Sequence, residues 1–201
     1  MTSTHKWLNM PDELRFQNLS ESRLTLDEVY DRILKFMAGD LRASYQFVIG
    51  TDSQGFHEYT KFVTGIIIRR MGKGAWACYR QVIVPREITS LKEKLTLETA
   101  LSQEVAYYFT DGVIDRMEEL LLPYVYQGAS LEHFIDIDAG TEPTINKTSL
   151  YVQEMVDRVT GMGTYAARVK PDAYAASAYA NRYTKRPVPY HLKRTLGRSI
   201  Q

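Results

Sequence analysis

The chain of 201 residues has almost no cysteine, no paired histidines and no long hydrophobic run. Cys78 is its single cysteine, which excludes an internal disulfide and cysteine-rich zinc sites and is typical of a reducing compartment. No stretch is long enough to span a membrane, and residues 1–7 lack the apolar run of a signal peptide. We therefore expect a cytoplasmic protein that does not associate with a membrane.

Acidic residues are missing from the whole segment 173–201, although the formal net charge of the chain is only +1. The basic residues of this segment are Arg182, Lys185, Arg186, Lys193, Arg194 and Arg198. Such a segment is often just a solvated end, but it can also contact the phosphate backbone of a nucleic acid. Our hypothesis is that Arg182, Lys185 and Arg186 bind RNA or DNA.

What remains is an ordinary globular composition, with 44% hydrophobic and 24% charged residues. The length favours one α/β domain with an extra N-terminal element. We divide the chain into a lead-in and helix (1–40), the main domain (41–185) and a basic C-terminal tail (186–201).

The first half of the chain predicts a helix and then three strands joined by short turns. Thr25 and Glu28 have the spacing of a capping box, so a helix should run from Leu26 to Met37. The predicted strands are Phe47–Asp52, Lys61–Arg70 and Ala75–Val84, and Gly72 to Gly74 make a hairpin turn. Short connections of this kind produce an antiparallel meander.

Helices and strands alternate in the second half. Leu97, Leu101, Val105 and Tyr108 form an apolar stripe that predicts a helix over Leu91–Phe109, and Glu98 flanks this stripe. Asn146 can cap a later helix, and Pro171 can start the last helix at its first turn. The further predicted elements are helix Val113–Leu122, strand Glu132–Asp138, helix Lys147–Thr160, strand Tyr165–Val169 and the alanine-rich helix Asp172–Tyr183.

Acidic residues follow three of these predicted strands. Asp52 ends an apolar strand where Ser53, Gln54 and Gly55 indicate a turn, and Asp136 and Asp138 end a second apolar strand before Gly140. Residues two apart on a strand share a face, so Asp136 and Asp138 should point the same way, about 7 Å apart. Asp172 lies just past the last strand.

Each acid has a plain structural explanation when taken alone. An Asp after a strand usually bonds its own turn, and Asp172 suits the first turn of a helix without any metal. Taken together they are harder to explain, because like charges placed side by side are costly without a cation. The three tyrosines of the last helix, Tyr174, Tyr179 and Tyr183, could stack on bases, but packing tyrosines are commoner.

Four stretches of the chain resemble the YkuK-like family of ribonuclease H-like proteins. They are Val48–Gln54, Thr60–Gly65, Ile135–Glu142 and Lys170–Ala175, and the resemblance covers about residues 40–185. It implies a ribonuclease H-like mixed five-stranded sheet, an antiparallel meander followed by parallel strands, flanked by helices. It implies the fold more firmly than a reaction, because no settled activity defines this family.

Nucleases of the wider superfamily place acids on the first strand, the first helix, the fourth strand and the start of the last helix. The resemblance implies that Asp52 matches the first, Glu98 the second, Asp136 or Asp138 the third and Asp172 the fourth. Glu93 and Glu104 compete with Glu98 on the first helix.

The resulting hypothesis is a nuclease that hydrolyses phosphodiesters with Mg²⁺ or Mn²⁺. Such chemistry needs carboxylates that converge on two ions about 4 Å apart, and hard divalent ions prefer oxygen ligands. The alternative is a non-catalytic ribonuclease H-like module that binds nucleic acid or a protein partner and uses the acids structurally.

Overall fold

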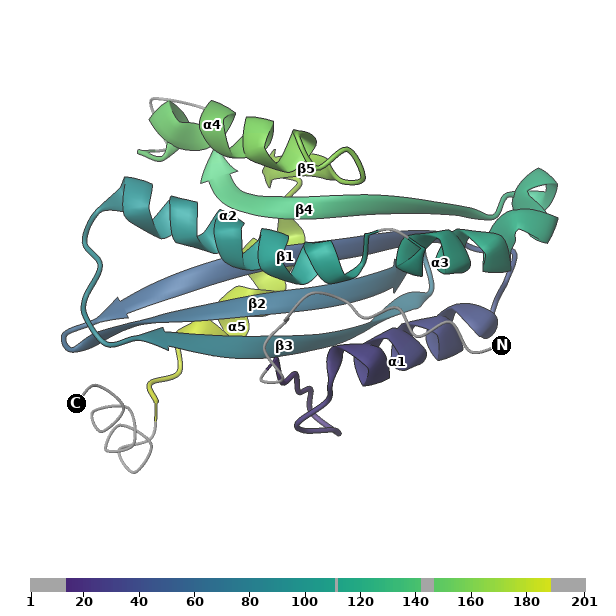
Figure 1. Ribbon diagram of the computed structural model, residues 1–201, viewed down its shortest axis with the longest axis horizontal. Helices are drawn as coiled ribbons and strands as arrows, with labels where there is room; N and C mark the ends of the chain where they lie inside the picture. The colour runs from purple at the N-terminus through teal and green to yellow at the C-terminus, as the bar shows by residue number, and fades with distance from the viewer. Residues whose placement is uncertain (1–13, 111, 142–146, 189–201) are drawn as a thin grey trace.

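The computed structural model describes residues 14–110, 112–141 and 147–188. A five-stranded sheet with the order β3-β2-β1-β4-β5 lies at the centre (Figure 1). Its strands are β1 (Ser44–Phe56), β2 (Tyr59–Arg70), β3 (Gly74–Val84), β4 (Ser130–Gly140) and β5 (Ala166–Lys170). The first three are antiparallel neighbours, whereas β4 is parallel to β1 and β5 is parallel to β4. The predicted mixed five-stranded α/β sheet is confirmed.

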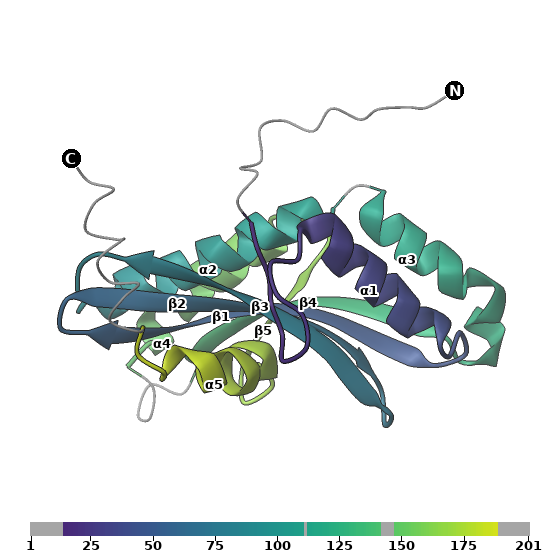
Figure 2. The same cartoon turned by 90° about the horizontal axis from the view of Figure 1, so that it is seen from below.

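Helices cover both faces of the sheet (Figure 2). One face carries α1 (Leu26–Ala38), α2 (Leu91–Tyr108), α3 (Val113–Leu121) and α4 (Ser149–Thr160), and a short 3₁₀ helix, η1 (Leu122–Gln127), leads into β4. The other face carries the last helix, which consists of η2 (Ala175–Ala180) and α5 (Asn181–Thr184). No helix among the described residues is long and apolar enough to cross a membrane.

The central strand β1 is buried from both sides. Phe47 and Ile49 point into the large core beneath α1 to α4, while Val48 packs with Ala175 of the last helix. The two periodic faces of one strand therefore belong to two different hydrophobic clusters. Side chains further along β1 must accordingly lie under α2 or under the last helix.

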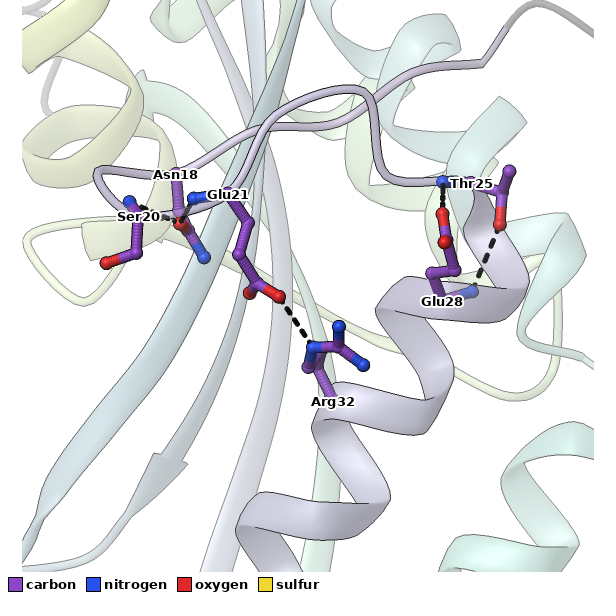
Figure 3. Close-up of polar contacts among 6 residues, drawn as sticks. All are labelled: Asn18, Ser20, Glu21, Thr25, Glu28 and Arg32. Carbon is purple, nitrogen blue, oxygen red and sulfur yellow. Dashed lines mark hydrogen bonds and ion pairs between the residues drawn. The ribbon is translucent and has the colours of Figure 1, made fainter.

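The predicted capping box of α1 is confirmed (Figure 3). The Glu28 N–H donates to the Thr25 hydroxyl, and the Thr25 N–H donates to the Glu28 carboxylate over 2.8 Å. Glu21 binds Arg32 one turn further along, with 2.7 Å between Oε1 and Nε. Val29 and Ile33 are fully buried, so α1 shares the main core of the sheet.

The turn expected directly after Asp52 is wrong. Strand β1 continues to Phe56, because Ser53 pairs with Phe62 of β2 and Gln54 pairs with Lys61. The reversal comes later, at His57 and Glu58. Asp52 is therefore held inside the sheet by a continuous ladder.

The apolar stripe expected on α2 is also wrong in its details. Leu97 and Leu101 are only half-buried, whereas Glu98 and Ser102 lie on the buried face. The Ser102 hydroxyl bonds to the hydroxyl of Thr51 on β1 over 2.8 Å. A polar contact to the sheet therefore turns the helix, and it brings Glu98 inward.

The last helix begins later than expected. Pro171 and Asp172 lie in a turn after a cis Lys170–Pro171 bond, and the helix starts only near Ala175. Its start is marked by the Ala175 N–H, which donates to the Asp136 carboxylate over 2.6 Å. The Asn146 cap expected for α4 lies outside the described residues.

Asp136 ties together β4, β5 and the last helix. Its Oδ1 lies 2.8 Å from both Nε and a terminal nitrogen of Arg168 on β5, and its side chain is fully buried. The Arg168 guanidinium lies between the rings of Phe134 and Tyr174, 4.3 and 4.5 Å from their centroids. Two side-chain rings and a buried carboxylate thus fix this arginine.

We predict that Asp136→Ala lowers the free energy of unfolding by about 3–5 kcal/mol, because it leaves the Arg168 charge buried without its partner. Urea unfolding in metal-free buffer measures this. The control is Asp115→Ala in the exposed first turn of α3, which should cost less than about 1 kcal/mol. Equal effects of the two variants would contradict a structural role for Asp136.

Candidate functional site

Asp52 lies on β1 beneath the end of the last helix. Its side chain is buried, and the Thr184 hydroxyl of α5 donates to its Oδ2. Burial raises the pKa of Asp52 to about 6, and the nearby Asp138 carboxylate adds to the rise. A bound cation would stabilise the charged form of a carboxylate that is both buried and repelled by a second carboxylate.

Glu98 approaches the same region from α2. Burial raises the pKa of Glu98 to about 8, and the carboxylates of Asp52 and Asp138 raise it further. The Ser53 hydroxyl beside Glu98 lowers it. The competing acids of α2 are engaged elsewhere, because Glu93 pairs with Arg86 and Glu104 with Arg80.

Asp138 completes the group from β4. The parallel register of β1 and β4 sets Gly50 opposite Asp136, so Asp52 and Asp138 lie at the same end of neighbouring strands. Oδ1 of Asp138 lies 3.0 Å from Nζ of Lys170. This contact is an ion pair without the alignment of a hydrogen bond, and Oδ1 is otherwise buried without a partner.

The other two predicted acids are placed differently. Asp136 faces the last helix, and both of its oxygens are engaged, by Arg168 and by the N–H of Ala175. Asp172 is exposed in the turn after β5, where its N–H donates to Val169 O over 2.9 Å. Asp52, Glu98 and Asp138 therefore interact electrostatically, with Asp52 beneath the last helix and Glu98 on the buried face of α2, while Asp136 is bound within the fold and Asp172 lies at the surface.

Sequence reasoning missed four residues that surround these carboxylates: Ser53, Lys94, Lys170 and Thr184. Ser53 and Lys170 lie within the stretches that resemble the family, so the signal was present in part. Thr184 had none, because only the packing of the last helix against β1 brings it to Asp52.

The predicted nucleic-acid residues lie at the end of the last helix. Arg182, Lys185 and Arg186 are exposed, and they flank Thr184. Buried Lys61 of β2 holds this end in place, since its Nζ donates to the carbonyls of Tyr183 and Arg186 over 2.7 and 2.9 Å. Lys193, Arg194 and Arg198 lie outside the described residues.

The tyrosines of the last helix pack against the protein. Tyr183 is buried and stacks on Tyr79 of β3, with ring centroids 3.8 Å apart. Tyr174 and Tyr179 are half-buried, and Tyr179 leaves no room for a side chain at Gly65 of β2. The packing explanation thus accounts for all three rings.

As the side chains stand, no three His, Cys, Asp or Glu residues in the described part of the chain are arranged to hold a metal ion. The chemistry of the donor set nevertheless suits Mg²⁺ or Mn²⁺. Asp52, Glu98 and Asp138 offer only carboxylate oxygens, and one of these oxygens is buried without a hydrogen bond.

Comparisons with known proteins agree on one family. A family model described as Ribonuclease H-like matches residues 28–185. The chain is 45% identical over 176 residues to the uncharacterized protein YkuK of Bacillus subtilis (strain 168), covering 88% of this chain and 100% of that protein. No solved structure matches the chain.

The raised pKa of Glu98 predicts how stability depends on pH. Between about pH 4.5 and 8 the folded state holds a proton that the unfolded chain releases, so stability should fall as pH rises through this window. Glu98→Gln should flatten the fall. At pH 8 to 9 its free energy of unfolding should exceed that of the parent by roughly a few kcal/mol.

Urea unfolding from pH 5 to 9 in the presence of a chelator tests this, with the exposed Glu119→Gln as the control. An identical pH dependence in the parent and in Glu98→Gln would show that Glu98 is not buried as described.

Proposed function

The chain belongs to the ribonuclease H-like family, and from that premise we propose that it is a metal-dependent nuclease acting on RNA or DNA. The observation that carries the proposal is that Asp52 of β1 and Asp138 of β4 lie at the same end of neighbouring strands and that both act electrostatically on Glu98 of α2. Each of these elements is held by the core for reasons unrelated to the acids. Asp138 raises the pKa of Asp52, and both raise the pKa of Glu98, so this repulsion costs stability.

Asp52, Glu98 and Asp138 would hold Mg²⁺ or Mn²⁺ in this proposal, and exposed Asp172 would join at the rim. A divalent ion bound there supplies an activated water and charge stabilisation for phosphodiester hydrolysis. The Thr184 hydroxyl orients the Asp52 carboxylate. Asp136 has a different part, because it positions β4 and the last helix.

The substrate track would run along the end of the last helix. Thr184, which contacts Asp52, is followed directly by Lys185 and Arg186, both exposed. A phosphate backbone bound by these side chains would therefore pass beside the carboxylates. Lys61 fixes the backbone of this segment, so the two cations are presented from a rigid support.

One observation favours a second function, a module that binds nucleic acid or a protein without cutting it. Thr184 and Lys170 already give Asp52 and Asp138 partners from within the chain. In such a module the acids would be structural, and the fold would not respond to divalent ions.

Thermal unfolding with and without Mn²⁺ separates the two functions. Mn²⁺ at a hundred times its dissociation constant stabilises a specific site by about 2.7 kcal/mol, which for this size raises Tm by about 5–10 °C. Asp52→Asn should abolish most of the rise, whereas the exposed control Asp115→Asn should keep it. A rise that survives in Asp52→Asn would contradict the site.

The same proteins are then incubated with Mn²⁺ and labelled single-stranded RNA, single-stranded DNA, RNA–DNA hybrid and branched DNA. The nuclease proposal expects at least one substrate to be cut by the parent and by Asp115→Asn but not by Asp52→Asn. Binding without cutting, together with no thermal response to Mn²⁺, would favour the binding module.

The basic residues Lys185 and Arg186 lead to a separate prediction about how nucleic-acid binding depends on salt. Replacing Lys185 and Arg186 by Ala together should reduce the slope of log affinity against log salt by about 1 to 2, because each lost phosphate contact removes about 0.9. Binding is measured by fluorescence anisotropy with the substrate identified above.

The control for this measurement is Arg116→Ala on α3, which lies at the far end of the sheet from the last helix (Figure 1). It should leave the salt slope unchanged. An equal loss in both variants would mean that the phosphate contacts are spread over the surface.

A further inference from the structure

Lys170 is a cation placed directly among the acids, and its position comes from an irregularity in the sheet. Asp136 pairs with Arg168, but the next register position pairs Gly140 with Lys170. Strand β4 therefore advances four residues while β5 advances two. A bulge of this kind re-aims side chains, and here it leaves Nζ of Lys170 3.0 Å from Oδ1 of Asp138.

The charge of Lys170 reaches a second carboxylate of the group. It lowers the pKa of Asp52, whose own strand does not contact β5 in the sheet. Lys94 of α2 acts in the same sense on Glu98 from the other side. Because Oδ1 of Asp138 has no hydrogen bond, the Lys170 ammonium is the group that balances its charge.

The neighbouring pair on the same two strands is built differently. Arg168 contacts Asp136 through two nitrogens, and its side chain is only 13% exposed. Lys170 makes one contact from a side chain that is 43% exposed. A lysine is a point charge on a flexible stem, so it can leave the carboxylate when another cation arrives, whereas the arginine is fixed.

We propose that Lys170 supplies one of the cations of the carboxylate site, so that each chain binds a single Mg²⁺ or Mn²⁺ ion beside it. This rests on the proposed nuclease function and deepens it. In the metal-free protein the ammonium pairs with Asp138 and partly offsets the charge of Asp52. With an ion bound by the carboxylates, Lys170 would be free to contact a phosphate of the substrate.

Isothermal titration of the full chain with Mn²⁺ tests the inference through binding alone. The parent should bind one ion per chain. Lys170→Met should bind its ion about tenfold more tightly, since a competing positive charge is gone. Lys170→Arg should keep the parent's affinity within about threefold, because it keeps the charge.

A matched control is available at the other end of the sheet. Lys73 also contacts an aspartate, Asp40, over 3.0 Å from an exposed position. Lys73→Met should leave the Mn²⁺ affinity unchanged, which separates loss of a cation in the site from loss of any surface charge.

Thermal unfolding gives a second readout that a merely structural lysine would not move. Without metal, Lys170→Met should melt below the parent, because Asp138 loses its counter-charge. With saturating Mn²⁺, the rise in its melting temperature should exceed the parent's rise. A structural role would lower both melting temperatures equally and would overturn the inference.

Failure of the inference and failure of the proposed function are distinct outcomes. Two ions bound by the parent, or an unchanged affinity in Lys170→Met, would overturn the role of Lys170 while leaving a metal site that depends on Asp52. No Mn²⁺ bound by the parent or by Lys170→Met would overturn both.

Discussion

The parallel pairing of β1 with β4 is the constraint on which the rest of the structure depends. It sets Gly50 opposite Asp136 and so places the acidic ends of two distant segments side by side. Parallel neighbours require a long connection, and this connection supplies β2, β3, α2 and α3. The hydrophobic residues of β1 then need cover on both faces, which α2 and the last helix provide.

Buried acids are handled in two ways in this protein. Both oxygens of Asp136 have partners, Arg168 and a helix N–H. Asp136 thereby links β4, β5 and the last helix. Burial raises the pKa of all three acids, but Asp52 and Glu98 are also repelled by neighbouring carboxylates, whereas Arg168 lowers the pKa of Asp136. Buried charges without full compensation are common at functional sites, where a bound ligand can supply the missing compensation. This contrast is why we assign structure to the first acid and chemistry to the others.

The last helix connects the two halves of the proposed function. Its first residues are held by Asp136, and its end carries Thr184 against Asp52 and the exposed Lys185 and Arg186. Its close approach to the sheet depends on small residues, because Gly65 of β2 lies directly against Tyr179. The acidic site and the basic track are therefore parts of one rigid contact between a helix and a sheet.

The amino-acid sequence by itself determined the order of the elements, since periodicity, the Thr25 capping box and the Gly72 to Gly74 turn are local signals. It also singled out Asp52, Glu98 and Asp138, although it could not separate them from Asp136 and Asp172. That separation required the tertiary structure, because Asp136 and Asp138 differ only in what β5 and the last helix bring to them. The same reason explains two other features. The hydrogen bond between Ser102 and Thr51 decides the rotation of α2, and a bulge between two strands decides the position of Lys170. Local patterns record which backbone a segment prefers, whereas the partners of a side chain come from segments far away in the chain.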